Sequence, residues 1–102
     1  MGLVVVVVRG VSDRAKGFLA SVMLEVGVGV YVSPKMSQRV RAQVQEILID
    51  WHRIQPMGGM VWIWQDKKAP SGLAILQVGE PYRALHDAEG IWITRSIHME
   101  KK

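Results

Sequence analysis

The chain of 102 residues has no cysteine, which excludes a disulfide-stapled scaffold and any metal site built from thiolates. This absence fits a reducing compartment, and we therefore expect a cytoplasmic protein. No apolar run approaches the ~18–20 residues that a membrane-spanning helix needs, so we expect no membrane partner. The N-terminus has no basic region ahead of its apolar run and no small-residue cleavage pattern, so we expect no signal peptide.

Acidic residues are scarce in the first two-fifths of the chain. Residues 1–41 hold two anions, Asp13 and Glu25, against six cations. Residues 42–102 hold seven charges of each sign, so the net charge of +4 lies wholly in the first part. A localised excess of positive charge favours an anionic partner, nucleic acid first. The alternative interpretation is a mildly basic, solvated surface.

Valine is abundant near the start of the chain. Residues 3–8 are consecutive apolar residues, five of them Val, and they run directly into Arg9. Such β-branched side chains favour a strand, and the lack of polar alternation predicts that both of its faces are covered. The cations Arg9, Arg14 and Lys16 then gather at one end of a central strand. This is a place suited to holding a polyanion.

The rest of the pattern predicts two helices and four further strands. We expect helices over residues 12–26, with Ser12 as N-cap and Gly27 at the end, and over residues 37–52, with Ser37 as N-cap. We expect strands at residues 28–32, 60–65, 73–78 and 91–95, the second and third joined as a hairpin, with a polar connection over residues 79–90. Pro34 is expected in a turn, and Arg39 and Arg41 are expected to face outward from the second helix.

This order predicts an α+β protein with an antiparallel sheet and both helices on one face. With 49% apolar residues, the chain is expected to form a single domain over residues 1–96, followed by a charged, flexible tail at 97–102. A further short strand, hidden elsewhere in the chain, would make the fold the ferredoxin-like βαββαβ sandwich with a short additional C-terminal strand. Periodicity alone leaves this alternative open.

Aromatic and histidine residues give weaker signals. The three histidines are widely spaced and show no metal-ligand pattern. Trp62 and Trp64 share one face of the strand at residues 60–65, where they either offer a stacking platform for bases or are buried against the helices or a partner. We expect burial.

Three ordered blocks carry a family resemblance from residue 3 to about residue 95. The first is the valine run with Arg14-Ala15-Lys16-Gly17; the second holds Leu24-Glu25-Val26, Gly29-Val30-Tyr31-Val32 and Ser37-x-Arg39-x-Arg41; the third holds Trp64, Ser71-Gly72, Gln77-x-Gly79, Arg83 and Asp87-x-Glu89-Gly90. In this order and spacing the blocks resemble Cas2, the small CRISPR adaptation protein, in its type I-E form.

The resemblance implies a ferredoxin-like fold in a symmetric homodimer that lies between two dimers of Cas1. It implies a scaffold that holds protospacer duplex DNA through its phosphates for integration into the CRISPR array, while Cas1 carries the integration chemistry. It implies DNA-backbone contacts by Arg14 and Lys16, with further basic positions at Arg39, Arg41 and Arg83. The C-terminal segment of this form is implicated in docking Cas1 and in dimer contacts.

Whether the protein is an enzyme depends on Arg9. Many Cas2 proteins have an acidic residue at or just after the end of the first strand, and the two copies in the dimer can hold a divalent metal for phosphodiester hydrolysis. Arg9 takes that position here, where it repels metal and attracts phosphate, so we count it among the nucleic-acid-binding residues.

Asp13 is the only acid near Arg9 in the sequence. An aspartate in a first helical turn is more often a capping or dipole residue than a ligand. We therefore expect no cofactor for scaffolding. The alternative function is a Mg²⁺-dependent endonuclease on RNA or duplex DNA, with Asp13 at a site in the dimer interface.

Overall fold

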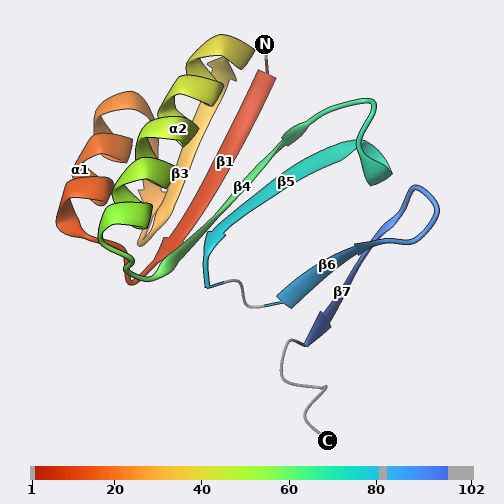
Figure 1. Ribbon diagram of the computed structural model, residues 1–102. Helices are drawn as coiled ribbons and strands as arrows, with labels where there is room; N and C mark the ends of the chain where they lie inside the picture. Colours follow the sequence, from red (N-terminus) through yellow and green to blue (C-terminus); the bar gives the residue numbers. More distant parts are fainter. Residues whose placement is uncertain (1, 81–82, 97–102) are drawn as a thin grey trace, which may run out of the picture.

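The computed structural model describes residues 2–80 and 83–96, which form two antiparallel sheets and two α-helices (Figure 1). The elements are β1 (Gly2–Arg9), α1 (Asp13–Val22), β2 (Leu24–Gly27), β3 (Val30–Met36), α2 (Gln38–Ile54), β4 (Gly59–Gln65), the 3-10 turn η1 (Pro70–Gly72), β5 (Leu73–Gly79), β6 (Arg83–Asp87) and β7 (Trp92–Ser96). The tail predicted at residues 97–102 lies outside the described residues.

The main sheet has the strand order β2-β3-β1-β4-β5, and every neighbouring pair is antiparallel. The valine-rich strand β1 is therefore central, as predicted. Both helices cover the same face of this sheet (Figure 1). The first six elements give the βαββαβ order of the ferredoxin-like fold, with β5 added at one edge. The predicted fold class is confirmed, and β2 is the hidden strand.

The predicted end of the first helix is wrong. Helix α1 ends at Val22, and Met23 caps it by donating its backbone N–H to the Leu19 carbonyl over 2.8 Å. The chain then enters β2, where Leu24 pairs with Val32 of β3. Val26, predicted to extend the apolar stripe of the helix, is 63% exposed on this strand. Pairing with β3 overrides the helical spacing of these residues.

Strand β3 starts later and runs further than predicted. Val28 and Gly29 form the turn between β2 and β3, and Gly29 has a φ of +74°, which favours glycine. A Cβ on Gly29 would lie 2.6 Å from the Val8 carbonyl oxygen. Pro34 lies inside β3 and not in a turn after it. Pro34 lies opposite the shift in the β1–β3 register between Gly2 and Val4. Proline has no backbone N–H to donate, and at such an irregularity this does not interrupt the hydrogen-bond ladder.

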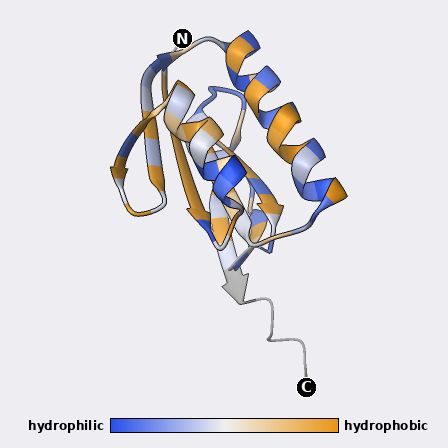
Figure 2. Cartoon of the chain, turned by 90° about the vertical axis from the view of Figure 1, so that its left-hand side faces the viewer, coloured by the Kyte–Doolittle hydropathy of each residue, from blue (hydrophilic) through white to orange (hydrophobic). Residues whose placement is uncertain are grey.

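The core lies between the two helices and the side of the sheet that they cover. Its fully buried side chains are Val4, Val6, Leu19, Tyr31, Leu48 and Trp62. Figure 2 shows that apolar and polar residues alternate along both helices, as expected for helices that bury one side and expose the other. The burial of Trp62 confirms the expectation for this residue, so its ring offers no stacking platform at the surface of the molecule.

The other side of the main sheet is apolar, and neither α1 nor α2 lies on it. We call this side the outer face and define it by aliphatic residues of the three middle strands: Leu3, Val5, Val7, Val30, Val32, Val61 and Ile63. Leu3 is 50% exposed and Val7 is 37% exposed. The prediction that both faces of β1 are covered is therefore wrong for a single chain.

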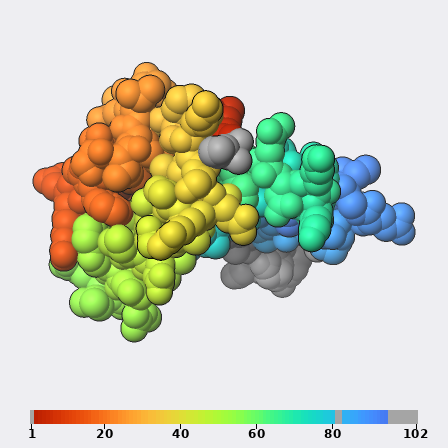
Figure 3. Space-filling model, turned by 90° about the horizontal axis from the view of Figure 1, so that it is seen from above, coloured from red at the N-terminus to blue at the C-terminus, as the bar shows by residue number. Residues whose placement is uncertain are grey.

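The connection predicted over residues 79–90 contains strand β6, which pairs with β7. This hairpin protrudes from the body of the molecule (Figure 3). It is attached beside β5 through the indole of Trp92, whose Nε1 donates to the Leu73 carbonyl over 2.7 Å. Gln77 Nε2 also donates to the Arg83 carbonyl over 2.9 Å.

Candidate nucleic-acid interface

Three of the predicted cations lie together where β1 leads into α1. Arg9 is the last residue of β1, and Ser12 caps α1 by accepting the Ala15 N–H over 3.1 Å. This cap starts the helix so that Arg14 and Lys16 both lie in its first turn. All three cations are exposed, and we call them the α1-end group. The predicted gathering of Arg9, Arg14 and Lys16 is confirmed.

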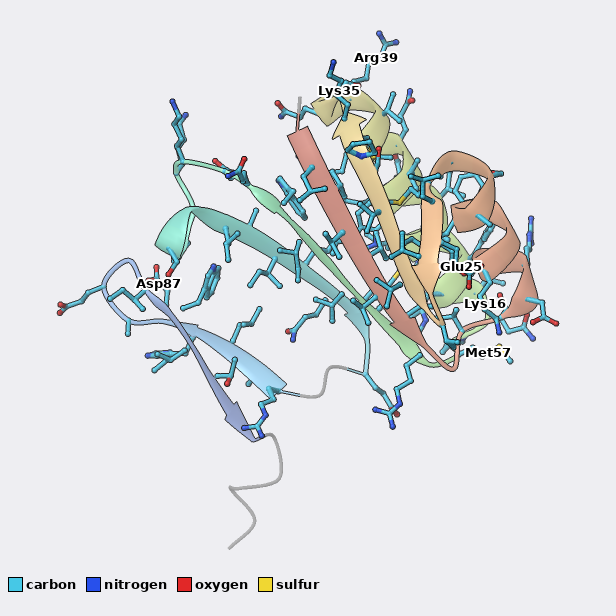
Figure 4. All side chains as sticks on the ribbon, turned by 180° about the vertical axis from the view of Figure 1, so that it is seen from behind. Lys16, Glu25, Lys35, Arg39, Met57 and Asp87 are labelled. Carbon is cyan, nitrogen blue, oxygen red and sulfur yellow. The ribbon has the colours of Figure 1, made fainter. Side chains whose placement is uncertain are left out.

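A second group of cations lies at the opposite end of β1. Lys35 is close to the end of β3, and Arg39 and Arg41 follow the Ser37 N-cap of α2. We call these three the α2-start group. Figure 4 shows Lys35 and Arg39 at one end of the molecule and Lys16 at the other. The residues of β1 between the two groups span about 23 Å at roughly 3.3 Å per residue.

Arg83 belongs to neither group. It is the first residue of β6, in the second sheet. Gly79, the last residue of β5, pairs with Gly59, and Gly59 pairs with Arg9. The chain therefore leaves the main sheet at its Arg9 end shortly before it reaches Arg83. A single protomer does not bring the six predicted residues into one patch.

Two of the arginines are stacked on tryptophan rings. The guanidinium carbon of Arg14 is 3.9 Å from the centroid of Trp51, a residue of α2. The guanidinium carbon of Arg41 is 4.2 Å from the centroid of Trp64, on β4. Cation–π contacts of this kind hold the plane of an arginine while leaving its edge open. No spacing rule in the sequence indicates either pair.

The prediction that Arg41 faces outward is wrong. Its side chain is half-buried over Trp64, and its Nε has no hydrogen-bond acceptor among the residues the structure describes. Burial lowers the pKa of Arg41, and the nearby Asp66 carboxylate opposes this shift. The α2-start group therefore presents Arg39 and Lys35 more openly than Arg41.

The end of β1 is a crowded junction of glycines. Gly58 has a φ of +64°, and a Cβ at this position would overlap the backbone of Arg9 and Gly10. The strands β1, β4 and β5 can approach this closely only because the residues at the junction are glycines, which have no side chain. A cavity of about 450 Å³ next to the junction is lined by Arg9, Gly58, Gly59 and Glu80.

The expectation that Asp13 is the only acid near Arg9 is wrong, because Glu80 lines the same cavity as Arg9. The register of β4 and β5 brings Glu80 to the cavity that Arg9 lines, whereas Asp13 is exposed and lies 3.6 Å from the Lys16 amine. The sequence predicted the hairpin of β4 and β5 but not its register, and the register is what places Glu80 near Arg9. Residues 2–80 and 83–96 contain no group of three His, Asp or Glu side chains placed to hold a metal ion.

These features define an α+β protein of the ferredoxin-like class, with cations at both ends of its central strand. A family model described as CRISPR-associated protein (Cas_Cas2CT1978) matches residues 3–93. The chain therefore belongs to this family of CRISPR-associated, Cas2-type proteins. No curated protein matches the chain. None of the helices in the described part of the chain is long and apolar enough to cross a membrane.

Proposed function

We propose that this chain is a type I-E Cas2 protein and a non-catalytic scaffold of CRISPR adaptation. Its homodimer bridges Cas1 dimers and holds protospacer duplex DNA by the phosphates for integration into the CRISPR array. The observation that carries the proposal is the pair of cation groups at the two ends of β1. Membership in a CRISPR-associated family supports the cellular context.

The spacing of the two groups fits a duplex. The strand of about 23 Å that lies between them matches the length of roughly seven base pairs, at about 3.4 Å per base pair. Arg14 and Lys16 lie in the first turn of α1, where free backbone N–H groups and the helix dipole also favour phosphate. A two-fold axis doubles each contact. Phosphate contacts position a duplex without reading its sequence, as a scaffold for varied spacers requires.

The outer face supports the homodimer. The residues that define it are cross-strand neighbours on β3, β1 and β4, and in a single chain they remain half-buried or exposed. A continuous apolar patch of this kind marks an interaction surface. A second copy of the sheet, packed face to face at about 10 Å, would cover β1 on both sides and account for its unbroken valine run. We therefore assign the outer face to a second copy of this chain.

The test of this function is reconstitution with the cognate Cas1. The variant Arg14→Glu/Lys16→Glu is expected to lose spacer integration while still binding Cas1. Because each dimer of the variant neutralises four fewer phosphates, the slope of log affinity against log salt should fall by about 3.6. Integration is followed with labelled protospacer DNA, duplex affinity by fluorescence anisotropy, and Cas1 binding by co-purification.

A matched control is Lys67→Glu/Lys68→Glu, which makes the same change of charge in the turn after β4. This control is expected to integrate spacers as the wild type does. If both double variants lose integration equally, bulk charge explains the effect. Normal integration by Arg14→Glu/Lys16→Glu would show that the DNA path is wrong.

The scaffold proposal also predicts the outcome of a nuclease assay. A hard cation needs carboxylate or carbonyl oxygens, and the cavity at the end of β1 offers one carboxylate, Glu80, beside the guanidinium of Arg9. These residues do not fit a Mg²⁺ site. Labelled RNA and duplex DNA incubated with the pure protein and Mg²⁺ are expected to show no more cleavage than with EDTA. Mg²⁺-dependent cleavage that disappears in Asp13→Ala or Glu80→Ala would establish the endonuclease alternative instead.

A further inference from the structure

Trp51 contacts two residues of the neighbouring helix. Arg14 and Phe18 lie four residues apart on α1, so they share one face of it. Arg14 stacks over the Trp51 ring, with its guanidinium carbon 3.9 Å from the centroid. Phe18 meets the same ring edge-on, at 5.3 Å between centroids and 61° between planes. The half-buried Trp51 side chain is therefore fixed by packing against α1.

The polar edge of the Arg14 guanidinium is the part that the stacking on Trp51 leaves open. Its guanidinium makes no hydrogen bond and no ion pair with residues 2–80 or 83–96. Stacking occupies a face of the guanidinium, while its N–H donors point outward in the plane of the group. A phosphate can accept two parallel hydrogen bonds from that edge. Lys16 differs, because its amine is 3.6 Å from the Asp13 carboxylate and is a point charge on a flexible stem.

We propose that Trp51 is a positioning residue for Arg14, which it holds with its donor edge open so that the arginine is ordered before DNA arrives. This inference rests on the proposed function, in which Arg14 contacts a DNA phosphate. Ordering a long side chain opposes binding, and an arginine that is already seated avoids most of that cost. The alternative is that Arg14 only covers Trp51, with no consequence for DNA.

A double-mutant cycle on the whole chain distinguishes a positioning role of Trp51 from the alternative in which Arg14 only covers the tryptophan. The probe is a duplex of about 30 base pairs of arbitrary sequence, roughly three helical turns. Trp51→Leu is expected to weaken binding about fivefold for each subunit contact, the factor that corresponds to an exposed cation–π contact. It should leave the salt slope unchanged, because the Arg14 charge remains. Trp51→Phe keeps an aromatic face and should bind close to the wild type.

Arg14→Ala supplies the other side of the cycle. It should weaken binding and lower the salt slope by about 1.8 for a dimer, and Trp51→Leu should then have no further effect in the Arg14→Ala background. The Arg14 δ-methylene protons should also show an upfield ring-current shift in NMR spectra of the free protein, which Trp51→Leu abolishes.

The outcomes separate failure of this inference from failure of the proposed function. If Trp51→Leu weakens binding by the same factor with and without Arg14, its role is structural and the inference is wrong. Wild-type binding by Trp51→Leu would also overturn it. If Arg14→Ala changes neither affinity nor salt slope, the DNA path itself is wrong at this position, and the inference falls with it.

Discussion

Trp62→Ala is expected to lower the free energy of unfolding by about 3–5 kcal/mol, as truncation of a fully buried aromatic side chain does. Trp62 is 0% exposed and lies on β4 between its cross-strand partners Val6 of β1 and Leu76 of β5. Its indole Nε1–H donates a hydrogen bond to the Met60 sulfur over 3.4 Å, so the ring is oriented as well as buried. Because a domain of this size has about 5–15 kcal/mol of stability in total, the loss is a large fraction. Urea denaturation followed by circular dichroism measures it.

Trp92→Ala is the matched control for this prediction. It makes the same chemical change on the β6–β7 hairpin, where the indole Nε1 of Trp92 donates one hydrogen bond to the Leu73 carbonyl. Losing that hydrogen bond should lower the free energy of unfolding by about 1 kcal/mol, because the Leu73 carbonyl can then accept a hydrogen bond from water. Equal destabilisation by the two substitutions would mean that the hairpin belongs to the same cooperative core as the main sheet.

The parts of the fold that could be predicted from the sequence are set by local chemistry. The valine run fixes β1, the alternation around Trp62 fixes β4, and serine N-caps at Ser12 and Ser37 start both helices where expected. Residues 24–27 could not be assigned in this way. Val26 fits the apolar stripe of the preceding helix, and only the long-range pairing of residues 24–27 with β3 makes this segment a strand.

The candidate site could be predicted where neighbours in sequence are neighbours in space. Arg9, Arg14 and Lys16 are gathered by one short strand-to-helix turn. Arg41 over Trp64 could not be predicted, because the contact depends on how α2 lies over β4. Glu80 reaches the end of β1 only through the register of two hairpin strands. The missing information is in each case tertiary geometry.

Val5→Glu is expected to separate the proposed homodimer into folded monomers. Val5 lies in the middle of the outer face, flanked by its cross-strand partners Val32 and Ile63. In a dimer that packs two outer faces together, the two-fold axis buries two unpaired carboxylates, and an uncompensated buried charge costs about 3–5 kcal/mol. The dissociation constant should therefore rise by about 100-fold or more. Sedimentation equilibrium measures it.

The fold itself should tolerate this change, because the outer face of a single chain is open to water. Val28→Glu is the matched control: Val28 is 101% exposed at the turn between β2 and β3, away from the outer face, and its variant should remain dimeric. Monomeric Val5→Glu should keep the circular dichroism spectrum of the wild type and bind DNA through one set of cations instead of two, so its salt slope should fall by about half. A dimer that persists in Val5→Glu would show that the two copies meet elsewhere, and the unbroken valine run of β1 would then need another partner to cover it.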